Sequence, residues 1–106
     1  MVTAEQIQAG KALAEAAGLA MYAKVGERDA CGFGWVEVYV DRTNSKQAKE
    51  LLKAGFRKDY KPKCLSMWDP AGVPTQSVSV KEAGAEAYAT YLTALGLRAY
   101  AGSRLD

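Results

Sequence analysis

Apolar residues recur along the chain at two spacings, which separate predicted helices from predicted strands. Residues 4–17 form an alanine-rich stretch; Thr3 and Gln6 before and within it have the spacing of a capping box, and Gly18 is suited to end the helix. Residues 31–40 alternate small or branched side chains with aromatic ones, the pattern of a half-buried strand. The sequence therefore predicts a first helix and a strong central strand.

Two further helices are predicted from capping signals. Asn44 and Gln47 offer a cap and box for a helix that runs through Lys53. Ser79 and Glu82 form another capping box, which opens what we expect to be the longest helix of the chain.

Shorter apolar segments predict the remaining strands, at residues 19–25, 63–68 and 97–101. The predicted order is α-β-β-α-β-α-β over residues 1–106. We therefore predict a single two-layer α+β domain, in which a sheet of about four strands carries three helices mainly on one side.

Composition narrows the setting of this domain. The chain has 106 residues, of which 49% are hydrophobic and 25% charged, as expected of one globular domain. The first residues do not resemble a signal peptide, and no run approaches the roughly 18 apolar residues that span a bilayer. We therefore expect a cytoplasmic protein without a membrane partner, with Cys31 and Cys64 as reduced thiols.

The absence of histidine restricts the chemistry of the chain. It removes serine-histidine and cysteine-histidine nucleophile systems, and two cysteines alone make a structural zinc site unfavourable. We predict no catalytic residues, no metal and no cofactor, hence a protein that is not an enzyme. The alternative is a small enzyme that uses Cys31 or a carboxylate. In the first case, the Cys31 thiolate would need a nearby cation or helix N-terminus to stabilise it.

Positive charge is concentrated in the middle of the chain. The net charge is only +2, but residues 41–63 hold eight basic side chains against three acidic ones. Three of the lysines share one stripe of the predicted helix, and the others continue beyond its end. This set can follow a phosphate backbone, although a solvated helix face has the same appearance. Its candidate binding residues are Lys46, Lys49, Lys53, Arg57, Lys58, Lys61 and Lys63.

The central strand supplies the aromatic candidates. Alternation places its valines on one face, suited to a core beneath helices, and Phe33, Trp35 and Tyr39 on the other. If helices cover only one face of the sheet, these three residues form an exposed aromatic row, which Trp68 from another strand joins.

This strand resembles the longer signature of RNA-recognition-motif domains. The matching residues read Cys-Gly-Phe-Gly-Trp-Val-Glu-Val at positions 31–38. The resemblance implies that Phe33 and Trp35 stack on bases of single-stranded RNA. Two positions depart from the signature, since Cys31 replaces a basic residue and Val38 replaces an aromatic one. The same residues also suit an ordinary strand with no binding role.

A second resemblance extends over about residues 30–106. The residues that carry it are Cys-Gly-Phe-x-Trp-Val at positions 31–36, Gln76 and Ser77, an alanine-rich repeat in the last helix, and Ser-Arg-Leu-Asp at 103–106. Together they resemble a family of small uncharacterised bacteriophage and prophage proteins. This resemblance implies a bacterial host cytoplasm and brings no established activity.

Two functions from different classes follow as hypotheses. The first is a non-enzymatic, phage-type binding protein that contacts single-stranded RNA or DNA through the aromatic face and the basic segment. The second is a protein-protein interaction module, such as a phage accessory protein, an inhibitor of a host factor or of host defence, or a virion component, with the same aromatics as interface anchors. Homo-oligomerisation is a related hypothesis.

Overall fold

Three helices and a four-stranded antiparallel sheet make up the computed structural model, which describes residues 1–106 and confirms the predicted α+β class. A short 3-10 turn, η1 (Gly26–Arg28), follows the first helix. The elements in chain order are α1 (Ala4–Val25), β1 (Gly32–Tyr39), α2 (Lys46–Lys53), β2 (Arg57–Lys58), β3 (Cys64–Trp68), α3 (Val78–Ala94) and β4 (Arg98–Leu105).

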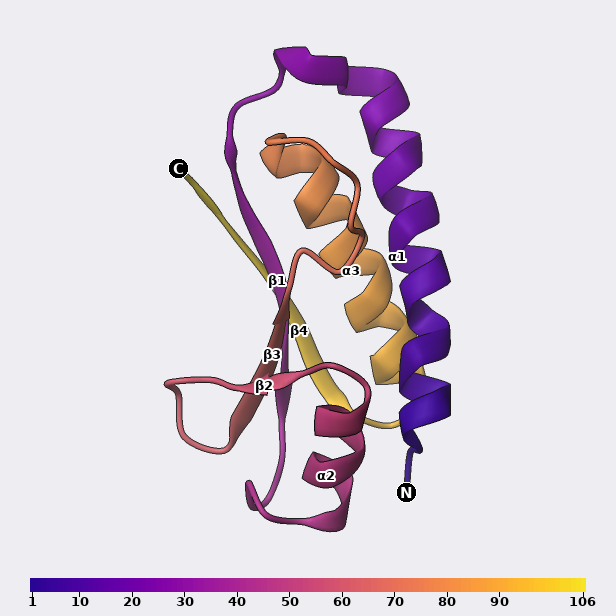
Figure 1. Cartoon of the computed structure of the whole chain (residues 1–106), viewed down its shortest axis with the longest axis vertical. Helices are drawn as coiled ribbons and strands as arrows, with labels where there is room; N and C mark the ends of the chain where they lie inside the picture. The colour runs from indigo at the N-terminus through magenta and orange to yellow at the C-terminus, as the bar shows by residue number, and fades with distance from the viewer.

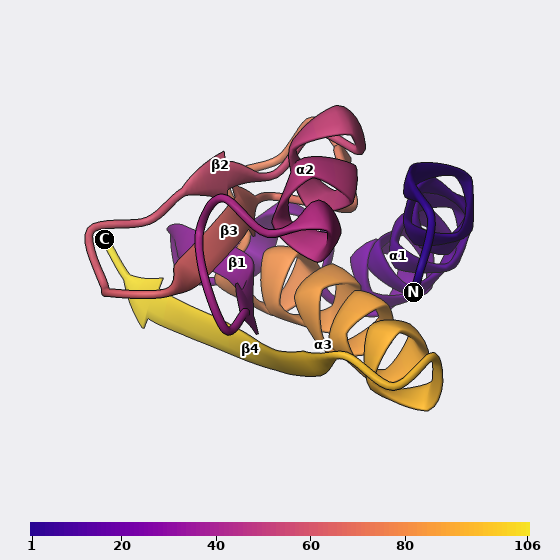
Figure 2. The ribbon, with the colours of Figure 1, turned by 90° about the horizontal axis from the view of Figure 1, so that it is seen from below.

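The sheet has the order β2-β3-β1-β4, and every neighbouring pair is antiparallel. Two β-α-β units follow α1. In the unit β1-α2-β2 the two strands run parallel, with β3 between them in the sheet. In the unit β3-α3-β4 the two strands also run parallel, with β1 between them. This interleaving is the split β-α-β connectivity. All three helices lie on the same side of the sheet, with α1 on the outer side of α3 (Figures 1 and 2). None of the three helices combines the length and the apolar composition that a membrane span requires.

The predicted valine face of β1 forms the centre of the core. Val36 and Val38 have no exposed surface and pack among residues of α2 and α3. At the other end of the strand, the first turns of α3 lie directly on Gly32 and Gly34. A Cβ atom on Gly34 would be 2.7 Å from the backbone of Lys81. The small residues of β1 therefore set how closely α3 approaches the sheet.

Small residues also bring α1 against the rest of the molecule. Gly10, Ala14 and Gly18 are buried at intervals of four, on one stripe of α1. A Cβ atom on Gly10 would lie 2.5 Å from the Tyr91 ring. The hydroxyl of Tyr88 donates to the Ile7 carbonyl at 2.7 Å, so α3 is also hydrogen-bonded to the first turns of α1.

The predicted strand at residues 19–25 is wrong, because this segment continues α1. Gly18 is a packing residue within the helix, and the helix ends at Gly26, whose φ of 58° lies in the left-handed region. Met21, Tyr22 and Val25 follow Gly18 at helical spacing and pack on a small separate cluster. The fourth strand is β2 instead, in a segment for which no strand was predicted.

Two predicted helix caps shift by one or two residues. Ser45 caps α2 where Asn44 was predicted, and Ser77 caps α3 where Ser79 was predicted. The carboxylate of Asp29 accepts hydrogen bonds from the Ser77 hydroxyl and from the Ser79 N–H, and these bonds lower the pKa of Asp29 to about 2. The longest helix is α1, with 22 residues against 17 for α3.

Replacing Gly18 by leucine tests the close packing of α1. A Cβ atom added at Gly18 would lie only 2.8 Å from the Cβ of Ala71, and a leucine is larger still. Gly18→Leu should therefore lower the free energy of unfolding by about 1–3 kcal/mol or more. The control is Ala16→Leu, which adds the same side chain at an exposed position of α1. Urea denaturation compares the two; equal stabilities would contradict the assigned role of Gly18.

Candidate functional site

The face of the sheet opposite the helices carries the predicted aromatic residues. Phe33, Trp35 and Tyr39 alternate with the buried valines of β1 and are half-buried. Trp68 of β3 lies directly opposite Trp35 in the β1–β3 register and is 48% exposed. The structure therefore brings together the four predicted aromatic candidates on one open face. Tyr100, opposite Glu37 on β4, shares this face.

The two tryptophans form the centre of this face. Their rings stack with centroids 4.6 Å apart and an interplanar angle of 23°. The Trp35 indole lies over Gly102 of β4, where a Cβ atom would be 2.5 Å from the ring. Phe33 meets the edge of Trp68 with centroids 5.9 Å apart. Trp35 is thus held by its neighbours, and Trp68 presents the outermost ring.

Cationic side chains surround this aromatic cluster. The Arg104 guanidinium carbon is 5.2 Å from the centroid of Phe33 and 5.9 Å from that of Trp68. The Lys81 ammonium lies 5.5 Å from the Phe33 centroid. Such contacts stabilise the cations beside the rings by about 0.5–1 kcal/mol each at an exposed site. The face therefore combines stacking surface with positive charge.

A buried carboxylate, Glu37, organises the middle of the open face. Its residue is only 8% exposed. One oxygen accepts hydrogen bonds from the Trp35 indole at 2.7 Å and the Lys61 ammonium at 2.8 Å, and the other accepts the Tyr39 hydroxyl at 2.9 Å. Three donors thus fix one carboxylate, and the carboxylate fixes an indole, a phenol and the loop after β2.

These bonds also set the titration of the group. Burial raises the pKa of Glu37, but the hydrogen bonds from Lys61, Trp35 and Tyr39 outweigh burial and leave that pKa below its ordinary value. The same contacts raise the pKa of Lys61, and the bond to the carboxylate raises the pKa of Tyr39 to about 12. At neutral pH, Glu37 is therefore an ionised acid paired with a lysine.

The aromatic cluster and this network enclose a small pocket of about 110 Å³. That volume is well below the roughly 300–1,000 Å³ of pockets that enclose a small molecule. The open face is therefore suited to surface contact. The residues that line the pocket are Trp35, Glu37, Asp59, Tyr60, Lys61, Trp68 and Arg104.

The structure divides the predicted basic segment between the two sides of the sheet. Lys46, Lys49 and Lys53 are exposed on α2, whose buried residues pack beneath the sheet on the helix side. Lys53 also pairs with Glu50 at 3.1 Å. These lysines therefore do not adjoin the aromatic face.

The second half of the basic segment lies nearer to the aromatics. Arg57 is opposite Ser66 in the β2–β3 register and so shares the open face, and Lys61 reaches Glu37. Lys58 and Lys63 are exposed on the edge strand and in the turn before β3.

Sequence reasoning did not name Glu37 or Arg104 among the candidate site residues. Glu37 had a signal, because it alternates with the aromatic residues of β1 and must therefore lie among them. Arg104 had none, since the predicted last strand stopped at residue 101, whereas β4 continues to Leu105 and places Arg104 opposite Phe33.

The two thiols of the chain differ in their surroundings. Burial, together with nearby Asp59, raises the pKa of Cys64 to about 11, which disfavours its thiolate. Cys31 is an exposed thiol before β1. No group of three or more histidine, cysteine, aspartate or glutamate side chains is placed to hold a metal ion.

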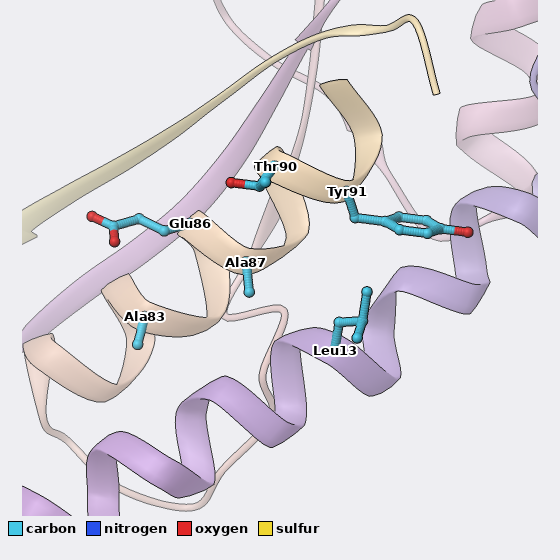
Figure 3. A pocket seen from close by; sticks show the side chains of 6 residues that line it. All are labelled: Leu13, Ala83, Glu86, Ala87, Thr90 and Tyr91. Atoms are coloured by element: carbon cyan, nitrogen blue, oxygen red, sulfur yellow. The ribbon is translucent and has the colours of Figure 1, made fainter. Parts of the chain in front are cut away.

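A shallow apolar groove between α1 and α3 is a second surface that the sequence did not reveal (Figure 3). Its lining offers only two polar groups besides the Tyr91 hydroxyl, and that hydroxyl is bonded to the Gln6 carbonyl. The groove therefore provides apolar contact without reactive chemistry. Its lining residues are Leu13, Ala83, Glu86, Ala87, Thr90 and Tyr91.

Comparison of the chain with protein-family models, with curated proteins and with solved structures gave no match. The connectivity and the open face thus define the chain as a split β-α-β domain with an aromatic, cation-flanked sheet surface. A fold of this kind hosts many functions, so the function is inferred from the residues of the open face and not from the fold.

Glu37→Gln tests the network beneath the aromatics. Losing charge-assisted bonds to a buried carboxylate should lower the free energy of unfolding by about 1–3 kcal/mol at neutral pH. Because the folded-state pKa of Glu37 is lowered, its stabilisation is present at neutral pH and is lost as pH falls through that pKa. Stability curves from pH 7 downward should therefore converge for wild type and variant. A constant difference would contradict the assignment; Glu86→Gln, at an exposed position of α3, is the control.

Proposed function

We propose that this chain is a non-enzymatic binding protein that contacts single-stranded nucleic acid through the open face of its sheet. The observation that carries the proposal is the stacked pair of Trp35 and Trp68, with Arg104 beside it, on the uncovered side of the two central strands. Aromatic rings stack on any base, and flanking cations neutralise phosphates.

The local resemblance to the RNA-recognition-motif signature supports the same surface. Those domains stack bases on aromatic residues of a four-stranded sheet. The signature residues Phe33 and Trp35 lie on the open face here, but the Trp35 ring already rests on Gly102 and Trp68. We therefore assign direct base stacking to Trp68 first, with Trp35 supporting it from beneath.

The α2 lysines take a secondary role in this proposal. They lie on the helix side, so a strand stacked on Trp68 reaches them only by passing the β2 edge. Arg57 and Lys58 lie on that edge and offer the intermediate phosphate contacts. We propose a path from the aromatic face over β2 toward α2, with most affinity supplied at the aromatic end.

The resemblance to small phage and prophage proteins supports a setting for this activity. We propose that the protein acts in the cytoplasm of a bacterial host. The absence of histidine from the sequence agrees with a role in binding without chemistry.

Fluorescence anisotropy of labelled single-stranded RNA and DNA tests the proposal. Trp68→Ala should weaken binding roughly 5- to 150-fold, because one stacked base contributes about 1–3 kcal/mol. Leu13→Ala is the control, since it removes an exposed apolar side chain from the α1–α3 groove. Affinity should fall as salt is raised, and Arg104→Ala should reduce that dependence by about one phosphate contact. No binding of either nucleic acid at low salt would reject the proposal.

One observation favours a second function, that of a protein-protein interaction module. Trp68 beside Arg104 pairs two of the three residue types that are enriched at the hot spots of protein interfaces. Immobilised wild type and Trp68→Ala should be compared for capture from nuclease-treated bacterial lysate. A partner that survives nuclease and is lost with Trp68→Ala supports the module; capture that nuclease abolishes supports nucleic acid.

A further inference from the structure

The two edges of the sheet differ in what they offer to another strand. One edge is β2, which has only two residues, and the other is β4, which has eight. Figure 2 shows β4 along one margin of the molecule with no segment outside it. Its sequence contains no proline, and its only charged residues are Arg98 and Arg104. Prolines and closely spaced charges are features that keep an edge strand from pairing with another chain. A long edge strand with few of them is able to pair with another strand.

The register shows which backbone groups of β4 are free. The Asp106 N–H donates to the Cys31 carbonyl at 3.0 Å, so hydrogen-bonded pairs with β1 fall at the even-numbered residues of β4. The odd-numbered residues direct their N–H and C=O groups outward. The Ala99 carbonyl accepts a hydrogen bond from the Thr93 hydroxyl at 3.3 Å, which agrees with a carbonyl that points away from β1. Ala101 and Ser103 are left as free donors and acceptors.

We propose that a second copy of this chain pairs its β4 antiparallel to this edge, with the two-fold axis at Gly102. Ala101 then faces Ser103 of the second copy, and the symmetric pair repeats this, which gives four backbone hydrogen bonds. The result is an eight-stranded sheet with the helices of both copies on one side and both aromatic faces on the other.

Charge favours this register over the one centred on Ala101. With the axis at Gly102, Arg98 lies opposite Asp106 of the second copy, and Tyr100 lies opposite Arg104. These are non-hydrogen-bonded pairs, in which side chains come closest. With the axis at Ala101, Arg98 would instead oppose Arg104 of the second copy, and like charges repel. The present partner of Arg98 is Asp41, at 3.6 Å and 99% exposed, a contact weak enough to be exchanged.

The helix side of the edge is also complementary. The same register places Leu105 of the second copy opposite Ala99. Leu105 is 68% exposed in the single chain. A groove between α3 and β4 lies beside Ala99, and its lining residues are Glu86, Ala89, Thr90, Thr93, Ala99, Tyr100 and Ala101. Pairing therefore covers an exposed leucine with an apolar groove.

The assembly closes at two copies. Both β4 edges are used in the pair, and the edges that remain are the two-residue β2 strands. A symmetric contact of one surface with itself gives a dimer and no filament.

Sedimentation equilibrium of the full chain tests this inference. Wild type should be a dimer, and Ala101→Pro should be monomeric because proline removes an edge donor. Arg98→Glu should weaken the dimer about 10-fold or more, since it faces Asp106 twice in the symmetric pair. Arg98→Glu combined with Asp106→Arg should restore it. Arg42→Glu, at an exposed position outside β4, is the matched control.

The outcomes separate this inference from the proposed function. Trp68→Ala should remain a dimer, because its side chain lies away from the edge. A wild type that is monomeric at every concentration overturns the dimer. A dimer unaffected by Arg98→Glu, or a double variant that stays dissociated, overturns the register. If Ala101→Pro does not fold by circular dichroism, the charge variants decide.

Discussion

The absence of side chains at Gly32 and Gly34 of β1 is the constraint on which the rest of the structure depends. Because a Cβ atom at Gly34 would collide with the backbone of Lys81, α3 can lie on β1 only while glycine occupies that position. Once α3 is there, α1 packs against it and α2 covers the remaining core. All the helices are thereby placed on one side. The other side of a sheet only four strands wide must then face solvent, and the aromatic residues of β1 lie on it.

Glu37 holds the side chains at the middle of the open face in place through its hydrogen bonds. Burying a carboxylate costs free energy unless donors replace its water. Here an indole, a phenol and an ammonium replace that water, each within 2.9 Å. The acid therefore fixes Trp35 flat over Gly102 and leaves Trp68 outermost. Its pairing with Lys61 also neutralises a negative charge that would otherwise repel phosphates at the centre of the proposed nucleic-acid surface.

The strand β1 was predictable because its two faces have different chemistry, and alternation alone assigned Val36 to the core and Trp35 to the open face. Gly18 was misread because a glycine after an alanine-rich helix has the same local sequence whether it ends the helix or packs within it; only Ala71 and Val73, far along the chain, decide. The division of the basic segment was invisible for a similar reason. Helical spacing places lysines on one stripe of α2, but which side of the sheet that stripe faces depends on tertiary packing.

Gly102 connects the proposed binding surface with the proposed dimer. On one side, its missing side chain lets Trp35 lie against β4. At the edge, it lies on the two-fold axis, where two strands meet most closely. In the proposed dimer, five strand spacings of about 4.8 Å separate β3 of one copy from β3 of the other, so the two Trp68 residues are about 24 Å apart on one continuous face. Under the proposed function, a single strand of nucleic acid long enough to reach both aromatic clusters would bind the second without leaving the first, which would raise its affinity above that of either site. The proposed dimer uses backbone groups of the β4 edge, whereas the proposed nucleic-acid surface uses side chains of the open face. Substitutions can therefore separate dimerisation from nucleic-acid binding, even though Gly102 takes part in both.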